Sequence, residues 1–161
     1  MYHPCDAKIT IDGKSKVYKN VGARMKGNTS RNSSFVTSDG KFDHSSNRWA
    51  HFKLSFATAF TKSDTNDYYT ETLTDEEKDA RKDRRFGEMK KIDFKWNKNY
   101  DYSYTKEAYA DDCLRSEGLI VQHTNLVKFT VKSESDSFTD TFLALETVDK
   151  PMLKRFLSKK E

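Results

Sequence analysis

One segment of strictly alternating character, Trp49–Phe56, constrains the fold of this chain more than any other feature. The apolar residues on one side of the extended segment are Ala50, Phe52, Leu54 and Phe56. His51 and Lys53 fall on the other side, with Trp49 and Ser55. Alternation with a period of two is the pattern of a β-strand. The segment therefore predicts a sheet, in which His51 and Lys53 share one side of a strand.

Further strands and two helices are predicted around this segment. The other predicted strands are 8–12, 17–25, 89–96, 126–132 and 139–148. The main helix is predicted from Ser103 to about Glu117, with Ser103 or Asp101 as its cap and Gly118 as its left-handed stop. A short helix follows Asp149. This order of elements predicts an α+β fold, a mostly antiparallel sheet with one main packed helix.

The composition is that of one folded domain with long polar loops. Aromatic residues make up 13% of the 161 residues, whereas disordered chains are poor in them. We find no repeat and no linker, so residues 1–161 are expected to form a single domain. The charged stretch 61–85 is interpreted as a surface insertion, with a solvated helix from about Asp75. Cys113 is expected to be a small buried residue of the main helix.

Charge and motif spacing exclude several function classes. The net charge of +4 is spread along the chain and forms no basic stripe, which argues against nucleic-acid binding. No apolar run approaches the roughly 18 residues of a membrane span. The four histidines lack metal-ligand spacing, and neither a CxxC nor an HExxH motif is present. No metal site is therefore predicted within this chain.

The main helix carries the first candidate for a functional site. Glu107, Ala110, Asp111 and Leu114 have the spacing of residues that share one helix face. A carboxylate on a packing face needs a partner, because an unpaired buried charge is costly. Lys53 is one candidate partner for Glu107. The alternative is an exposed glutamate and a lysine that points into solvent, which is the usual state of both residue types.

The second candidate is the segment Gly22–Ser30. Strand alternation puts Arg24 and Lys26 on one side, just before a loop that contains Asn28 and Ser30. The backbone N–H groups of such a loop can hold an anion. The segment has neither the Walker nor the usual kinase glycine spacing, so an ordinary polar turn is the alternative.

Six segments, in order, resemble the start of the CotH (spore coat protein H) kinase family. Residues 21–30 (VGARMKGNTS) are similar to its "VGIRxKGNSS" segment, and residues 52–56 (FKLSF) are similar to "yKLkF". The remaining segments are 86–94 for "fyGlkkLnL", 101–107 (DYSYTKE) for "DxSxxRE", 143–149 (LALETVD) for the end of "GlYxlvExvD", and 152–156 (MLKRF) for "flkrxf". Together these segments run through most of the chain.

The resemblance implies the N-lobe of an atypical protein-kinase-like fold that binds ATP with Mg²⁺ and phosphorylates proteins. In such a fold a strand lysine contacts the phosphates and a helix glutamate orients it. The family match assigns these roles to Lys53 and Glu107. His51 would line the adenine pocket, and Glu146 would approach the hinge. The residues expected near the phosphates are Arg24, Lys26, Asn28 and Ser30.

The same resemblance implies a protein substrate in a bacterial spore coat, or a secreted or cell-surface protein. Lys106 replaces the family's arginine, Asp140 stands in place of its glycine, and Phe142 replaces its tyrosine. The family's catalytic aspartates fall beyond residue 161, so these residues alone are expected to be an inactive N-terminal part of the kinase domain.

Two alternatives to an active kinase lobe remain open. One is a non-catalytic interaction module of a spore coat or cell surface, with the polar loop from Thr29 to Asn47 as its contact surface. The other is a degenerate family member that is kept as a scaffold, which the substitutions at Lys106 and Asp140 favour.

Overall fold

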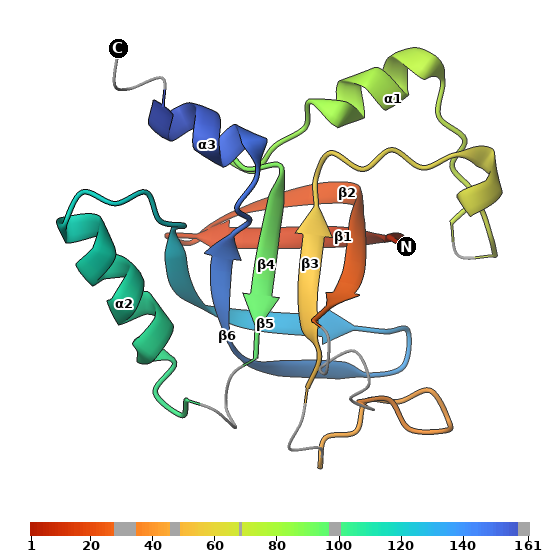
Figure 1. Ribbon diagram of the computed structural model, residues 1–161. Coiled ribbons are helices and arrows are strands. Elements are labelled where there is room, and N and C mark those ends of the chain that lie inside the picture. The colour runs from red at the N-terminus through yellow and green to blue at the C-terminus, as the bar shows by residue number, and fades with distance from the viewer. Residues whose placement is uncertain (28–34, 46–48, 68, 97–100, 158–161) are drawn as a thin grey trace. The chain divides into compact units, whose positions relative to one another are not determined.

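The computed structural model describes residues 1–27, 35–45, 49–67, 69–96 and 101–157 (Figure 1). The strands are β1 (His3–Ile11), β2 (Lys14–Lys26), β3 (His51–Ser55), β4 (Lys91–Lys95), β5 (Thr124–Lys132) and β6 (Ser137–Glu146). The helices are the 3₁₀-helix η2 (Lys62–Asp64), α1 (Asp75–Lys82), α2 (Thr105–Ser116) and α3 (Lys150–Leu157). The strands form one sheet in the order β1-β2-β3-β4-β6-β5. The predicted α+β class is confirmed.

Tight turns close the hairpins at the two edges of the sheet. Asp12 and Gly13 join β1 to β2, and both have a positive φ, 49° and 76°. A two-residue turn of this kind matches the twist of antiparallel strands and favours an Asp-Gly sequence. The β5–β6 hairpin pairs Lys132 with Ser137. Its turn includes a backbone hydrogen bond of 2.9 Å from Ser133 N to Asp136 O.

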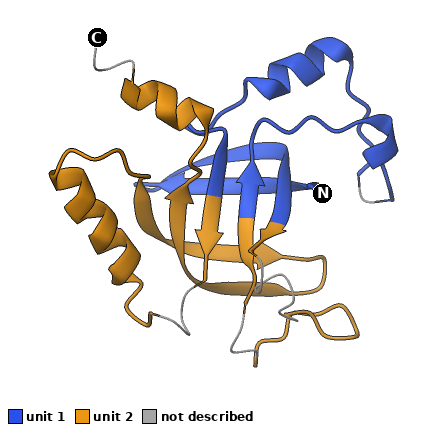
Figure 2. Cartoon of the chain, viewed as in Figure 1, with its two compact units in different colours: residues 1–24, 53–92 blue, residues 25–52, 93–161 orange. Residues whose placement is uncertain are grey.

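The chain divides into two compact units, each made of two separate segments (Figure 2). Unit 1 comprises residues 1–24 and 53–92, and unit 2 comprises residues 25–52 and 93–161. Strands β2, β3 and β4 each contribute residues to both units.

The core of unit 1 is aromatic. The Tyr18 ring packs edge-on against Phe56, with 5.0 Å between the ring centroids, and Phe86 contacts both rings. Arg84 donates hydrogen bonds to three backbone carbonyls beside this core, those of Phe56, Lys19 and Asn20. One guanidinium therefore ties the end of β3 and the middle of β2 to the segment after α1.

The core of unit 2 covers both faces of β6. Phe142 packs on Phe129 with 4.8 Å between ring centroids, and its neighbour Leu143 is fully buried as well. Leu143 and Leu145 form a cluster with Tyr104, against which Ala108 of α2 packs. Successive strand residues point to opposite faces. Aromatic rings thus cover one face of β6, and the start of α2 covers the other.

The segment predicted to be a charged insertion has a solvated helix and a buried anchor. Helix α1 contains no buried residue. Thr74 and Glu77 form a capping box at its start, in which each side chain accepts a hydrogen bond from the other residue's backbone N–H. Tyr69 and Leu73, which precede the helix, are buried. These two apolar residues hold an otherwise polar segment on unit 1.

Helix α2 has one of its two predicted capping side chains, that of Asp101, but differs from its prediction in its inner face. Tyr104 is the N-cap residue, and Asp101 accepts the Lys106 backbone N–H at 2.9 Å. The half-buried residues of α2 are Glu107, Ala108, Asp111 and Arg115. Leu114 is exposed, so it does not share the inner face with Glu107 as predicted. The prediction of a buried Cys113 was also wrong, because its position on α2 faces solvent.

The described helices are all short or polar. None of those in the described ranges has the length and apolar character needed to cross a membrane.

Candidate functional site

The predicted site residues fall into three groups. Lys26, His51, Glu107 and Glu146 belong to unit 2. Arg24 and Lys53 belong to unit 1. Asn28 and Ser30 lie outside the described residues.

Glu107 forms an ion pair with a strand lysine. Lys95 Nζ donates a hydrogen bond of 2.5 Å to Glu107 Oε1, and about a third of each side chain is exposed. Lys95 is the last residue of β4, and Glu107 lies in the first turn of α2, the next helix along the chain. A carboxylate in the first turn is also favoured by the helix dipole. The pair therefore has one end fixed on a strand and the other on a helix, while both groups remain accessible.

A second ion pair lies deeper in the same unit. Lys26 Nζ is 2.6 Å from Asp93 Oδ2, and the Asp93 side chain is only 6% exposed. An aspartate at this depth needs a cation beside it. Removing an unpaired carboxylate from water costs on the order of several kcal/mol. Lys26, at the end of β2, remains one-third exposed. Its ammonium therefore neutralises Asp93 from the solvent side.

His51 lies close to both lysines and is held neutral. Burial lowers the pKa of His51, and the positive charges of Lys95 and Lys26 lower it further. His51 Nδ1 accepts a hydrogen bond of 3.0 Å from the Trp96 backbone N–H. In a neutral imidazole the proton then resides on Nε2. His51 thus presents an N–H donor rather than a positive charge.

These five residues, Lys26, His51, Asp93, Lys95 and Glu107, are called the lysine–carboxylate cluster below. Its two ammonium groups are compensated by two carboxylates, so its formal charge is zero with His51 neutral. An anion that entered would share the ammonium groups with Asp93 and Glu107. The chemistry available to the cluster is the binding and orientation of an anionic group by ammonium and imidazole N–H donors.

Lys53 is buried, with 8% of its surface exposed. The alternative of a solvent-facing lysine is therefore wrong. The predicted pair of Lys53 with Glu107 joins residues of different units and stays a prediction. The pairing that sequence reasoning missed is Lys95 with Glu107, 12 residues apart. The signal was present, because Lys95 and Asp93 are two positions apart and so share one side of the strand just before the helix.

In the segment 22–30, close packing requires a glycine at position 22. A Cβ on Gly22 would lie 2.6 Å from the Thr58 hydroxyl oxygen, which is too close for any real contact. The Arg24 guanidinium lies over the Tyr2 ring, 5.2 Å from its centroid. Gly22 and Arg24 therefore have structural roles in unit 1, while Lys26 reaches the cluster in unit 2.

Glu146 forms a buried ion pair at the end of β6. Its carboxylate accepts a hydrogen bond of 2.6 Å from Arg155 Nη2 of α3, and its backbone N–H donates to His123 O. The Glu146 side chain is almost fully buried. In this structure the residue ties α3 to the sheet, and its predicted place near a hinge remains a prediction.

The described part of the polar loop predicted as a contact surface is anchored to the β5–β6 turn. Asp136 accepts hydrogen bonds from Phe42 N at 3.0 Å and from His44 Nε2 at 3.1 Å. Burial opposes ionisation of Asp136, but the bonds from the Phe42 and Ser137 backbones and from His44 outweigh it and lower its pKa. Asp136 therefore ties Phe42 and His44 to the β5–β6 turn.

Metal binding has no support in the described ranges. They contain no group of three or more His, Cys, Asp or Glu side chains placed to hold an ion. The lysine–carboxylate cluster offers two carboxylates, and each is already bound to an ammonium group.

Comparisons of the chain with protein-family models, with curated proteins and with solved structures find no match. The assignment of a function therefore depends on the residues and contacts described above.

Proposed function

We propose that this chain is the nucleotide-binding lobe of a CotH-like atypical protein kinase, and that it holds the phosphates of ATP. The observation that supports this best is the ion pair between Lys95 and Glu107. Protein kinases orient a strand lysine toward the nucleotide phosphates through a glutamate of the following helix. The same order, strand lysine and then helix glutamate, is found in β4 and α2.

In this proposal each member of the lysine–carboxylate cluster has a defined part. Lys95 binds the phosphates, and Glu107 holds its ammonium in place. Lys26 supplies a second ammonium beside them, and Asp93 fixes its position. His51 contributes an N–H donor without adding charge, because its pKa is lowered by burial and by the two lysines.

The family resemblance supplies the rest of the proposal. Bound Mg²⁺ would neutralise phosphate charge, and the described residues offer no set of ligands for it. A protein of a spore coat or a cell surface would be the phosphate acceptor. Lys53 remains the rival for the phosphate-binding role, because the "yKLkF" match assigns that role to it.

The first test is nucleotide binding by lysine variants. A charged hydrogen bond contributes about 1.5–3 kcal/mol, so Lys95→Ala should weaken ATP binding by about 10- to 100-fold. Fluorescence titration with a methylanthraniloyl-ATP probe measures this change. Lys128→Ala is the matched control, since Lys128 is an exposed lysine on strand β5 and lies outside the cluster. An affinity that Lys95→Ala leaves unchanged would remove Lys95 from the proposed site.

Glu107→Gln and Lys53→Ala separate the two possible lysines. Glu107→Gln should weaken nucleotide binding when Lys95 is present and have little further effect in Lys95→Ala, since the two residues act as a unit. If Lys53→Ala abolishes binding while Lys95→Ala does not, the phosphate lysine is Lys53. Circular dichroism melting curves check that each variant is folded. Loss of binding in both lysine variants with an intact fold would mean that both ammonium groups contribute.

A non-catalytic interaction module is the second candidate. The observation that favours it is the anchored loop 35–45, in which Asp136 fixes Phe42 and His44. Loops that a scaffold positions often carry the residues that contact a partner. Partner capture that is indifferent to ATP and to Lys53→Ala, but is lost in Asp136→Ala, would favour this function.

A further inference from the structure

The β1–β2 hairpin has one face on which an apolar row lies beside a basic row. Cross-strand register pairs Ile9 with Lys16 and Ile11 with Lys14. Directly opposed residues point to the same face, with Cβ atoms about 4.5–5.5 Å apart. The isoleucines therefore form a row on β1, and the lysines form a parallel row on β2.

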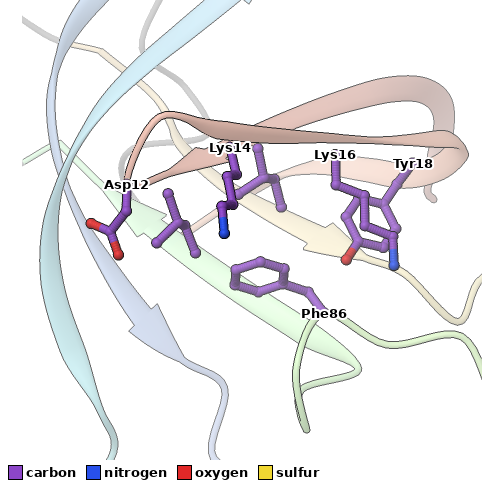
Figure 3. A pocket seen from close by; sticks show the side chains of 7 residues that line it. Asp12, Lys14, Lys16, Tyr18 and Phe86 are labelled. Carbon is purple, nitrogen blue, oxygen red and sulfur yellow. The ribbon is translucent and has the colours of Figure 1, made fainter.

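A pocket lies between this face and Phe86, an aromatic residue outside the hairpin. Phe86 stands over the face and, with Ile9, Ile11 and Tyr18, lines this pocket, whose volume is about 340 Å³ (Figure 3). Figure 3 shows Lys14 extending toward the Phe86 ring, with Asp12 at the turn end of the pocket. Every lining residue belongs to unit 1. The pocket thus shares no residue with the lysine–carboxylate cluster.

The charge of the pocket is mainly positive. Lys16 Nζ lies 4.9 Å from the centre of the Tyr18 ring, which holds its side chain beside the apolar floor. In the described part of the chain Lys14 forms no ion pair within 4.0 Å, and Asp12 is the single acidic residue that lines the pocket. An anionic ligand with apolar parts would be complementary to this surface.

We propose that this face binds an extended peptide in which acidic residues alternate with apolar ones. Side chains of an extended chain point alternately to its two sides and repeat every 6.6 Å or so on each side. A peptide lying between the two rows would therefore direct its acidic side chains to Lys14 and Lys16, and its apolar side chains to Ile9 and Ile11. The repeats match because the rows are themselves strand residues two positions apart.

A peptide fits the pocket better than a membrane surface does. Residues that insert into a lipid layer form a protruding apolar face, as on an amphipathic helix. Here Ile9 and Tyr18 line an open hollow beside Phe86 and not a protruding apolar face. The proposal does not depend on nucleotide binding, since none of its residues belongs to the lysine–carboxylate cluster.

The two faces of the hairpin provide matched controls for a binding test. The probe is a fluorescein-labelled hexapeptide of alternating Asp and Leu, titrated with the full chain and followed by fluorescence anisotropy. Lys16→Glu and Lys8→Glu change the charge equally, but Lys8 pairs with Val17 and lies on the opposite face. Ile11→Ser and Val17→Ser likewise remove side chains of similar exposure, 55% and 50%, from opposite faces.

Lys16→Glu should weaken binding about fivefold, because it replaces an attraction by a repulsion at an exposed site. Ile11→Ser should also weaken binding about fivefold, through lost apolar burial. Lys8→Glu and Val17→Ser should leave the affinity within about twofold, as changes at an exposed surface outside the contact do. Circular dichroism melting curves confirm that the four variants are folded.

Several outcomes would overturn the proposal. One is an absence of saturable binding up to about 1 mM peptide, the range of the weakest specific complexes. Another is an equal loss of affinity for variants on both faces. A third is equal binding of a peptide that alternates Lys and Leu, which would show that charge complementarity is not involved. Binding to anionic phospholipid vesicles through Lys16 and Ile11, without peptide binding, would assign the face to membranes instead.

Discussion

His51 is a basic residue that the folded protein keeps uncharged. Burial disfavours its protonated form, and Lys95 and Lys26 repel it. Alternation along β3 placed His51 and Lys53 on one side of the strand, but it did not show whether that side meets water. Lys53 and Asp93 are both buried polar residues. The alternation of residues shows which side chains share one side of a strand. Whether that side is buried depends on the other segments that cover it.

The neutral state of His51 predicts a pH dependence of stability. Its pKa is lower in the folded protein than the ordinary 6.5, so below that pH the unfolded chain binds more protons than the folded one. The free energy of unfolding should therefore fall as the pH is lowered from 7 to about 5. In His51→Asn, whose amide oxygen can still accept the Trp96 N–H, this dependence should be weaker.

Urea unfolding followed by tryptophan fluorescence at several pH values measures the effect of His51→Asn. His3→Asn is the control, because His3 is an exposed histidine at the start of β1. The same pH dependence in wild type and His51→Asn would show that His51 is not held neutral by the fold.

The candidate site was only partly predictable at the residue scale. Lys26, His51 and Glu107 were singled out from sequence, and the structure brings them into one cluster. Lys95 and Asp93 were missed as site residues. Which charged residues pair depends on their distance in the folded protein, and their spacing along the sequence does not give that distance. Several lysines were compatible with Glu107 until the end of β4 was placed beside α2.

The strands were more predictable than the helices because their patterns are local. Alternation predicted the two strands of the first hairpin, 8–12 and 17–25, although the turn itself is only Asp12 and Gly13. Gly118, with its φ of 79°, marks the end of α2 as expected. The inner face of α2 was assigned wrongly. Ala110 and Leu114 suggested an apolar stripe, yet Leu114 is exposed and Ala108 is the residue that packs on the sheet. A short polar helix has too few apolar residues to define its orientation by itself.

Two leucines that pair across β5 and β6 differ in burial, and their substitutions should therefore differ in their effect on stability. Leu143 is fully buried, and Leu126, directly across from it on β5, is 45% exposed. Leu143→Ala should lower the free energy of unfolding by about 3 kcal/mol, because it leaves a cavity in a packed core. Leu126→Ala should cost less than about 1 kcal/mol.

Urea unfolding curves of the two variants check this difference. Trp49 and Trp96 are buried in unit 2 and report on its unfolding by fluorescence. Equal destabilisation by the two substitutions would contradict the assignment of Leu143 to a core between β6 and α2.

At the scale of the whole molecule, the chain is two compact units that share three strands. Neither unit is continuous in sequence, because the segments 1–24 and 53–92 form the first, and 25–52 and 93–161 form the second. No boundary of this kind is visible in composition, since no linker separates the parts. The predicted single domain is neither confirmed nor contradicted by this division.

In unit 1, one arginine forms hydrogen bonds to backbone carbonyls of two distant segments. Arg84 donates to the carbonyls of Phe56, Lys19 and Asn20. Arg84→Ala should lower the free energy of unfolding by about 2 kcal/mol, because it removes three hydrogen bonds from a charged donor, of which only the one to Asn20 O has a second donor, Arg81 Nη1. Arg85→Ala should change it by less than about 0.5 kcal/mol, since Arg85 is exposed.

Thermal unfolding of Arg84→Ala and Arg85→Ala, followed by circular dichroism, compares the two neighbours. Similar melting temperatures for the two variants would show that the bonds of Arg84 add nothing to the stability of unit 1.

The sequence by itself determined the α+β class, the hairpins and the approximate positions of the main elements. These depend on alternation, turn residues and caps, which act over a few residues and are visible along the chain. Only the tertiary structure decided which charges pair, which polar faces are buried and which face of α2 points inward. Such features depend on residues far apart in sequence, such as Lys26 and Asp93, and their distances follow from the order of the strands in the sheet.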